Sequence, residues 1–118
     1  MAYTLLTATA LAKNTVSADL PITAGTAIDK TKTMHVLYPR EGKLVLILNN
    51  TYAGSSVITV SAGEYHANGI GSLAITMAQD DVKLLVLDSD RFKDFDGYIN
   101  LTFDANTTGY VQAFSLPF

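Results

Sequence analysis

The sequence contains no cysteine, no tryptophan and only three prolines, and its eight Lys or Arg residues face eleven Asp or Glu among 118 residues. The absence of cysteine excludes a disulfide framework, a thiolate metal cluster and a cysteine nucleophile. A formal net charge of −3 provides no basic surface for phosphates, so nucleic acid is not an expected partner. No run approaches the roughly 20 apolar residues of a membrane-spanning helix, and Lys13 follows the first apolar run instead of preceding it. We therefore expect no membrane span and no cleaved secretory signal.

β-Branched residues are abundant instead. Val, Ile and Thr account for 29 of the 118 residues, and these side chains suit a pleated sheet better than a helix. Short apolar or alternating runs, bounded by Gly, Pro, Ser, Asn or Asp, indicate seven strands at residues 33–38, 43–48, 56–62, 73–78, 82–88, 98–103 and 110–116. This spacing predicts an all-β fold, a single-domain antiparallel β-sandwich or β-barrel. A single helical turn fits near residues 88–95.

Two of these segments suggest how the strands are arranged. Residues 98–103 and 110–116 both alternate with period two, and the polar residues 104–109 separate them, so we expect a C-terminal hairpin. Residues 44–48 are apolar on both faces. That pattern is typical of a central strand covered on each side by another layer or by a neighbouring subunit.

The first 32 residues differ from the remainder. Ala and Thr dominate there, and no sustained alternation appears outside residues 3–9. Such a segment buries little surface by itself, so we predict an extended N-terminal arm over residues 1–32 and a β-sandwich domain over residues 33–118. Two interpretations of the arm remain open: it pairs with a sheet edge or a partner, or it is a loosely ordered terminus with one edge strand.

The sequence offers few groups for catalysis. Only His35 and His66 titrate near neutral pH, and neither has a second His, Cys or acid at metal-ligand spacing. His35 lies in a predicted strand, which favours a surface-facing or hydrogen-bonded structural histidine, and His66 lies in a turn-rich stretch without a nucleophile. Ser55 and Ser56 follow Gly54 but lead into a strand, unlike a serine nucleophile between strand and helix. We therefore predict that the protein is not an enzyme and has no catalytic residues.

Two further patterns were weighed as ligand sites. Residues 88–96 carry several carboxylates and precede Gly97, but no Glu closes a calcium loop there, so a solvated turn with local ion pairs is the favoured interpretation. Gly69 and Gly71 form a G-x-G pattern without the helix that a phosphate site requires. We predict neither a metal site nor a cofactor.

Four motifs follow one another along the chain: residues 42–50 (GKLVLILNN), 56–63 (SVITVSAG), 94–104 (DFDGYINLTFD) and 109–114 (GYVQAF). In this order, and with the opening MAYTLLT, the chain resembles the small head decoration proteins, or capsid cement proteins, of tailed bacteriophages. The resemblance implies a β-rich virion protein without an active site. It further implies that the protein binds the outer surface of the assembled major capsid protein lattice, commonly as a homotrimer, and stabilises that lattice.

We expect the partner contacts to come from the arm and from the apolar C-terminal tail, since both suggest burial beyond one small sandwich. The predicted contact residues are Tyr3, Leu5, Leu6, Phe114, Leu116 and Phe118.

Two alternative functions remain open. The first is a carbohydrate-binding β-sandwich module in which Tyr52, Tyr65 and Tyr98 stack on sugar rings and residues 88–96 hold calcium. The absence of tryptophan weakens this alternative. The second is another virion component, such as a tail or fibre adaptor, which composition does not distinguish from a head protein.

Overall fold

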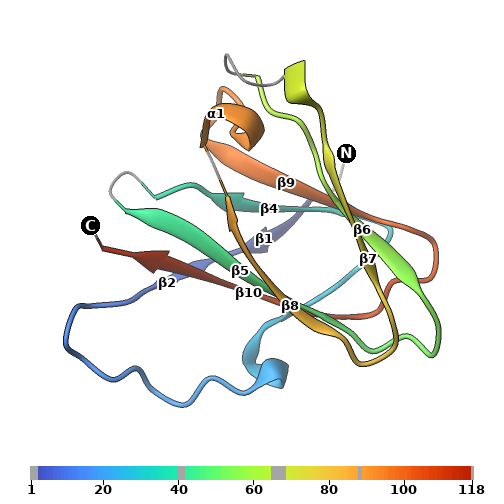
Figure 1. Ribbon diagram of the computed structural model, residues 1–118, viewed down its shortest axis with the longest axis horizontal. Helices are drawn as coiled ribbons and strands as arrows, with labels where there is room; N and C mark the ends of the chain where they lie inside the picture. The colour runs from blue at the N-terminus through green and yellow to red at the C-terminus, as the bar shows by residue number, and fades with distance from the viewer. Residues whose placement is uncertain (1–2, 40–41, 65–68, 88, 118) are drawn as a thin grey trace.

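A computed structural model describes residues 3–39, 42–64, 69–87 and 89–117 of the chain. Within these residues, two β-sheets pack face to face, accompanied by the 3-10 turn η1 (Ile22–Ala24) and one turn of α-helix, α1 (Ser89–Phe92) (Figure 1). Sheet 1 has the spatial order β1 (Tyr3–Leu6), β4 (Thr33–Leu37), β9 (Tyr98–Phe103), β6 (Ser56–Val60) and β7 (Leu73–Met77). Sheet 2 has the order β2 (Ala8–Ala10), β10 (Gly109–Leu116), β5 (Lys43–Asn50) and β8 (Val82–Leu87), and β3 (Thr26–Ala27) also pairs with β10.

The predicted all-β sandwich is confirmed, and the sheets do not close into a barrel. Each of the seven predicted strands is present with its ends shifted by no more than two residues, and α1 falls within the segment expected to contain a helical turn. Most neighbouring strands are antiparallel, but β1 is parallel to β4 and β2 is parallel to β10. Among the residues described, no helix is long and apolar enough to cross a membrane.

The predicted C-terminal hairpin is wrong, because β9 belongs to sheet 1 and β10 to sheet 2. The carboxylate of Asp104 organises the crossing: Oδ2 accepts a hydrogen bond from the Val57 backbone N–H at 2.8 Å, and Oδ1 accepts bonds from the Asn106 N–H at 3.0 Å and the Thr107 hydroxyl at 2.9 Å. These bonds hold the chain against β6 until it turns towards the other sheet. Period-two alternation is the same in hairpins and in strands of facing sheets, so the pattern alone did not distinguish them.

Three short strands within the arm predicted over residues 1–32 pair with strands of the two sheets, as one of its two interpretations allowed. β1 extends sheet 1 beside β4, and after Thr7 the chain continues as β2 beside β10 in sheet 2. Leu6, just before this crossing, lies in the core. The chain leaves β10 at Leu11, whose N–H donates to the Ser115 carbonyl at 3.0 Å, and returns at Pro21, whose carbonyl accepts from the Gln112 side chain at 2.6 Å. Among the described residues of this segment, residues 12–21 form the longest exposed stretch.

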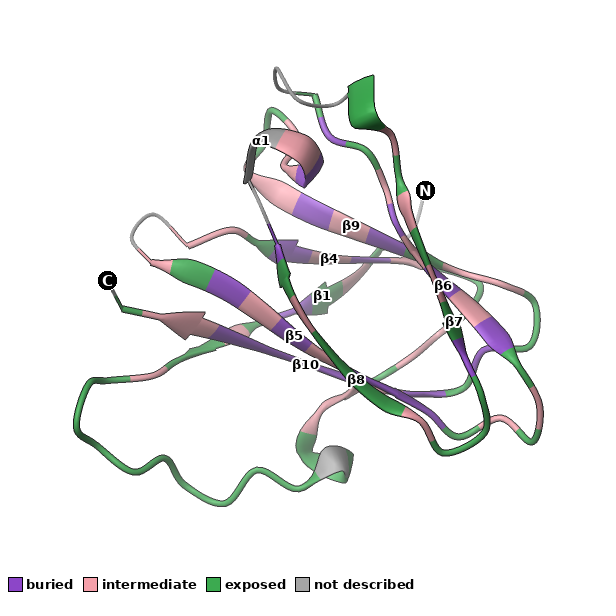
Figure 2. Ribbon diagram, in the orientation of Figure 1, coloured by how far each residue is buried: buried purple, intermediate pink, exposed green. Residues whose placement is uncertain are grey.

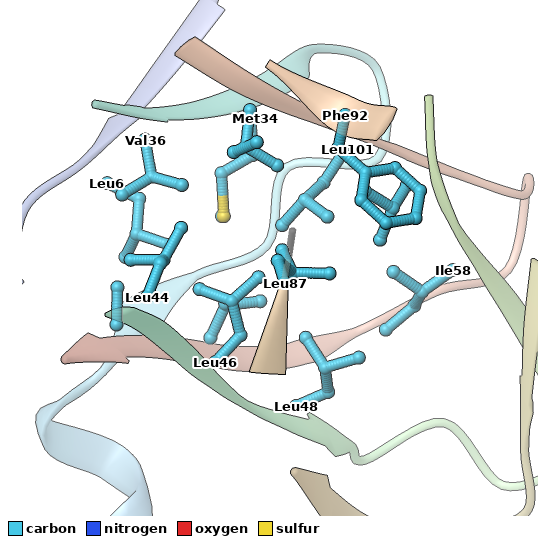
Figure 3. Packing of buried hydrophobic residues seen from close by; sticks show 14 of the residues in the cluster. Leu6, Met34, Val36, Leu44, Leu46, Leu48, Ile58, Leu87, Phe92 and Leu101 are labelled. Atoms are coloured by element: carbon cyan, nitrogen blue, oxygen red, sulfur yellow. The ribbon is translucent and has the colours of Figure 1, made fainter. Parts of the chain in front are cut away.

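One hydrophobic core fills the space between the sheets, as Figure 3 shows for part of it. Its buried members are Leu6, Met34, Val36, Leu44, Leu46, Leu48, Ile58, Val60, Met77, Leu87, Phe92, Ile99, Leu101, Val111 and Ala113. The alternate residues of β5, Val45 and Ile47, are only half-buried. The two apolar faces of β5 are therefore covered unequally within this chain.

A buried asparagine fastens the end of sheet 2 to the end of sheet 1. The Asn50 side chain is fully buried, and its Nδ2 lies 3.1, 3.2 and 3.0 Å from the carbonyl oxygens of Gly54, Met77 and Ala78. Its Oδ1 accepts a hydrogen bond from the Tyr52 N–H at 3.1 Å. Asn50 thus links the last residue of β5 both to the following loop and to the end of β7.

We predict that Asn50→Ala destabilises the fold by about 2–4 kcal/mol, because several buried backbone groups lose their partner at once. Asn106→Ala is the matched control, since Asn106 is exposed and bonds to Asp104 through its backbone N–H. Urea unfolding followed by circular dichroism measures both variants. Equal stability of the two variants would show that the Asn50 side chain does not couple the sheets.

Candidate functional site

Large apolar side chains remain exposed on the outer faces of both sheets. A two-layer sandwich buries one face of each sheet, so residues that point the other way have no cover within the chain. Figure 2 shows exposed and half-buried positions alternating with buried ones along several strands. Among the described residues, the large exposed apolar side chains are those of Tyr3, Leu5, Val16, Leu20, Leu37, Ile70, Val82, Leu84, Val86 and Phe95. Those on strands belong to two groups, one on sheet 1 and one on β8.

The first group, the aromatic patch, consists of Tyr3, Leu5, His35, Leu37 and Tyr98 on β1, β4 and β9. The strand register makes it continuous, since Leu5 lies opposite His35 and Leu37 lies opposite Tyr98. The His35 ring stacks between Tyr3 and Tyr98, with centroid distances of 4.8 and 4.3 Å and interplanar angles of 10° and 13°. Tyr3, Leu5 and Leu37 are 50%, 59% and 55% exposed. The patch is therefore an ordered apolar surface on paired strands.

The ring stack limits what this surface can bind. Both faces of the His35 ring are covered by tyrosines, and Tyr98 has one face against His35. A sugar ring or nucleobase packs on an open aromatic face, which His35 does not offer. Ring edges and leucine side chains suit the apolar contacts of a protein interface better.

A groove of about 470 Å³ adjoins the patch where the chain passes from β1 to β2. The residues that line it are Leu5, Leu6, Thr7, Ala8, Leu37, Tyr38, Pro39, Tyr98 and Ser115. Tyr38 is held in place by its hydroxyl, which donates to the Leu87 carbonyl at 2.9 Å. The largely apolar lining can accept an apolar side chain from a partner that lies on the patch.

The second group, the β8 strip, consists of Val82, Leu84 and Val86 on the outer side of an edge strand. Val86 lies opposite Val45 and Leu84 lies opposite Ile47 on β5, so the strip continues onto a half-buried apolar strand. The alternate residues of β8 face the other sheet.

The predicted contact residues are distributed unequally between surface and interior. Tyr3 and Leu5 belong to the exposed aromatic patch, whereas Leu6 and Phe114 are buried within the chain, and of these two Leu6 also lines the groove. Leu116 is half-buried, and Phe118 lies outside the described residues.

Sequence reasoning missed Leu37, the ring stack and the β8 strip. The apolar run in residues 84–87 was a readable signal, because it is apolar on both faces like residues 44–48. The stack left no local signal, since its three rings come from positions 3, 35 and 98.

The described residues that were candidates for catalysis or phosphate binding lie in the sheets or in a turn, where they contact other parts of the fold. His35 is the centre of the ring stack, and His66 lies outside the described residues. The Ser56 hydroxyl is buried in β6, and no hydrogen-bond partner is found for it in the part of the chain that the structure describes. The Gly71 carbonyl accepts a bond from Arg91 Nε at 3.0 Å, so the G-x-G turn holds an arginine.

The acidic stretch at residues 88–96 contributes to a turn. Asp88 and the side chain of Asp90 lie outside what the structure describes. Asp94 Oδ1 accepts a hydrogen bond from the Tyr98 N–H at 2.9 Å, and its Oδ2 accepts one from the Asn100 side chain at 2.9 Å. No group of three or more His, Asp or Glu side chains suited to a metal occurs among the described residues. Asp94 thus orients the start of β9 and, with it, the aromatic patch.

The two described tyrosines of the carbohydrate-binding alternative, Tyr52 and Tyr98, lie towards opposite ends of sheet 1. Tyr98 is the first residue of β9. Tyr52 lies in the loop before β6. The start of β6 lies beside the opposite end of β9, since the Val57 N–H donates to Asp104, the residue that follows β9. Tyr65 lies outside the described residues.

Comparison with known proteins identifies no relative, since no family model, no curated protein and no solved structure matches the chain. The function is therefore inferred from the two exposed surfaces and from the sequence motifs.

We predict that Asp104 makes the fold sensitive to acid. Burial raises the pKa of this carboxyl, but the hydrogen bonds from Asn106, Val57 and Thr107 outweigh burial and hold the pKa below its usual value of 3.8. Because the folded-state pKa is the lower one, the carboxylate stabilises the fold above its usual pKa, and that contribution is lost as the pH falls through the folded-state pKa.

Asp104→Asn should therefore lower Tm at neutral pH and reduce the further loss of Tm between about pH 5 and about pH 2. Thermal unfolding at several pH values measures both effects, with the exposed Asp96→Asn as control. An Asp104→Asn variant whose Tm follows pH as the wild type does would contradict the assignment.

Proposed function

We propose that this chain is a non-enzymatic structural protein that binds the outer surface of an assembled bacteriophage capsid and stabilises it. Two lines of support meet here: the ordered motifs that resemble phage head decoration proteins, and the exposed aromatic patch on sheet 1. The patch carries the proposal, because a protein that acts by adhesion needs an apolar surface that its own fold does not cover.

The patch is suited to binding because the fold holds it in place before contact. Tyr3, His35 and Tyr98 stand on three paired strands and stack on one another. Side chains that are already ordered lose little conformational entropy when a partner covers them. Leu5 and Leu37 flank the stack and also line the adjoining groove, which gives an apolar side chain of the capsid protein a place to insert.

Stabilisation follows from selective binding. A ligand that binds the assembled state and not the separated subunits shifts the equilibrium towards assembly by mass action. The proposal places the patch where capsid subunits meet, because a contact site of that kind exists only in the assembled lattice. Many identical copies on one shell multiply a modest gain per site, and no catalytic step is needed.

We predict that Leu37→Asp weakens binding to expanded empty shells of the phage by roughly 30-fold or more, because it places a charge in the centre of an apolar contact at a cost of about 2 kcal/mol. Leu37 is exposed at the end of β4, so the folded chain tolerates the change. Thr102→Asp is the matched control, since Thr102 is exposed in the same sheet but outside the patch.

Co-sedimentation with shells over a range of protein concentrations measures the effect. A Leu37→Asp protein that saturates shells like the wild type would move the contact to another surface. A wild-type protein that does not sediment with shells at all would overturn the proposed function.

A further inference from the structure

β8 is an edge strand with few of the features by which proteins usually block edge pairing. It is six residues long, contains no proline or glycine, and pairs only with β5 among the described strands. Leu84, in the middle of the β8 strip, is 66% exposed. An apolar edge of this kind pairs readily with another strand, and charges, prolines or bulges normally prevent this.

The neighbouring open edge of sheet 1 is protected in the usual way. Lys83 of β8 extends across to β7, where its Nζ donates a hydrogen bond to the Thr76 carbonyl at 3.0 Å. Lys83 also lies 4.0 Å from Asp81, and its side chain remains about half exposed. The single charged side chain of β8 therefore covers the free edge of β7 and does not cover the free edge of β8.

Residues 15–20 have the sequence pattern of a strand but pair with no strand among the described residues. In residues 15–20, Val16, Ala18 and Leu20 alternate with Thr15, Ser17 and Asp19, which is the period of a strand with one apolar side. The segment is nevertheless unpaired coil in the structure, and Val16 is 95% exposed. Within the described part of the chain, its side-chain hydrogen bonds are local, such as Thr15 to the Lys13 carbonyl at 3.2 Å.

In the described conformation, Leu20 is too far from the free edge of β8 in its own chain to pair with Val82. Pro21 is bonded to Gln112 on β10, and the order β10–β5–β8 places the free edge of β8 about three strand spacings away, or roughly 14 Å. Leu20 is one residue from Pro21 and so lies within about 3.8 Å of it along the chain. Figure 1 shows the connection on the β2 side of sheet 2, away from β8.

We propose that residues 15–20 of one copy add as an antiparallel strand to the free edge of β8 in a second copy. The register that places Asp19 opposite Lys83 also places Leu20 opposite Val82, Ala18 opposite Leu84 and Val16 opposite Val86. Opposite charges then meet on one face, and apolar residues meet on the other. A parallel register with the same ion pair puts Pro21 opposite Leu85, where a proline has no N–H to donate.

This contact is head to tail, so repetition closes a ring or extends an open chain. The contact uses sheet 2 and leaves the aromatic patch on sheet 1 free. It goes beyond the proposed function, because an assembly of several copies presents several patches to the same shell and gains avidity.

Engineered disulfides test the pairing directly, because the wild-type chain contains no cysteine. Residues directly opposite in an antiparallel pair lie close enough for a disulfide. Ala18→Cys and Leu84→Cys proteins, prepared separately and mixed under oxidising conditions, should give a mixed disulfide dimer of twice 12.7 kDa. Separate proteins exclude a bond within one chain, and Thr102→Cys mixed with Ala18→Cys is the control.

A mixed dimer that exceeds the control several-fold supports the contact. A yield equal to that of the Thr102→Cys control overturns it. Light scattering of the wild-type protein should give a multiple of 12.7 kDa, and a monomer at the highest soluble concentration also overturns it.

Charge reversal provides an independent readout in solution. Asp19→Lys should dissociate the assembly, and Asp19→Lys combined with Lys83→Asp should restore it. A double variant that remains dissociated, with a circular dichroism spectrum like that of the wild type, counts against the register. None of these measurements uses shells, so their failure is distinguishable from failure of the proposed function.

Discussion

A two-layer sandwich covers only one face of each sheet, and this constraint governs the rest of the molecule. In this chain 48% of the residues are hydrophobic and 16% are charged. Several strands therefore carry apolar side chains on both faces, although a face exposed to solvent is usually polar. Leu44, Leu46 and Leu48 fill the core, while Val45 and Ile47 on the same strand face outwards. The apolar side chains that do not fit in the core lie on strands at the outer faces of the sheets. Both proposed contacts, with the capsid and with a second copy of the chain, use these side chains.

Polar side chains in this protein chiefly hold the backbone where it changes direction. Asn50 ties the end of β5 to β7, and Asp104 guides the chain from sheet 1 to sheet 2. Asp94 bonds the N–H of Tyr98 and the side chain of Asn100, which orients the start of β9. The outer surface therefore depends on a few polar anchors, because they position the strands that carry the aromatic patch.

The local sequence pattern was enough to predict the strands between residues 33 and 118, because period-two alternation and turn residues depend only on neighbouring positions in the sequence. It failed where pairing is non-local. β9 and β10 alternate as hairpin strands do but belong to different sheets. The alternation over residues 3–9 likewise does not reveal that this stretch divides into β1 and β2, which pair with strands of different sheets. Tyr3 and Leu5 were predicted contact residues and belong to the exposed patch, whereas Leu6, one position further on, is buried by the same alternation.

Amide hydrogen exchange, followed by mass spectrometry, tests most directly whether the exposed apolar surfaces are interfaces. The free chain at low concentration, the free chain at high concentration and the shell-bound chain are compared. Amides of residues 15–20 and of β8 should exchange more slowly at high concentration, and those of β1 should slow only when shells are present. Identical exchange in these segments under all three conditions would contradict the account, because it would mean that no partner covers the surfaces that the sandwich leaves open.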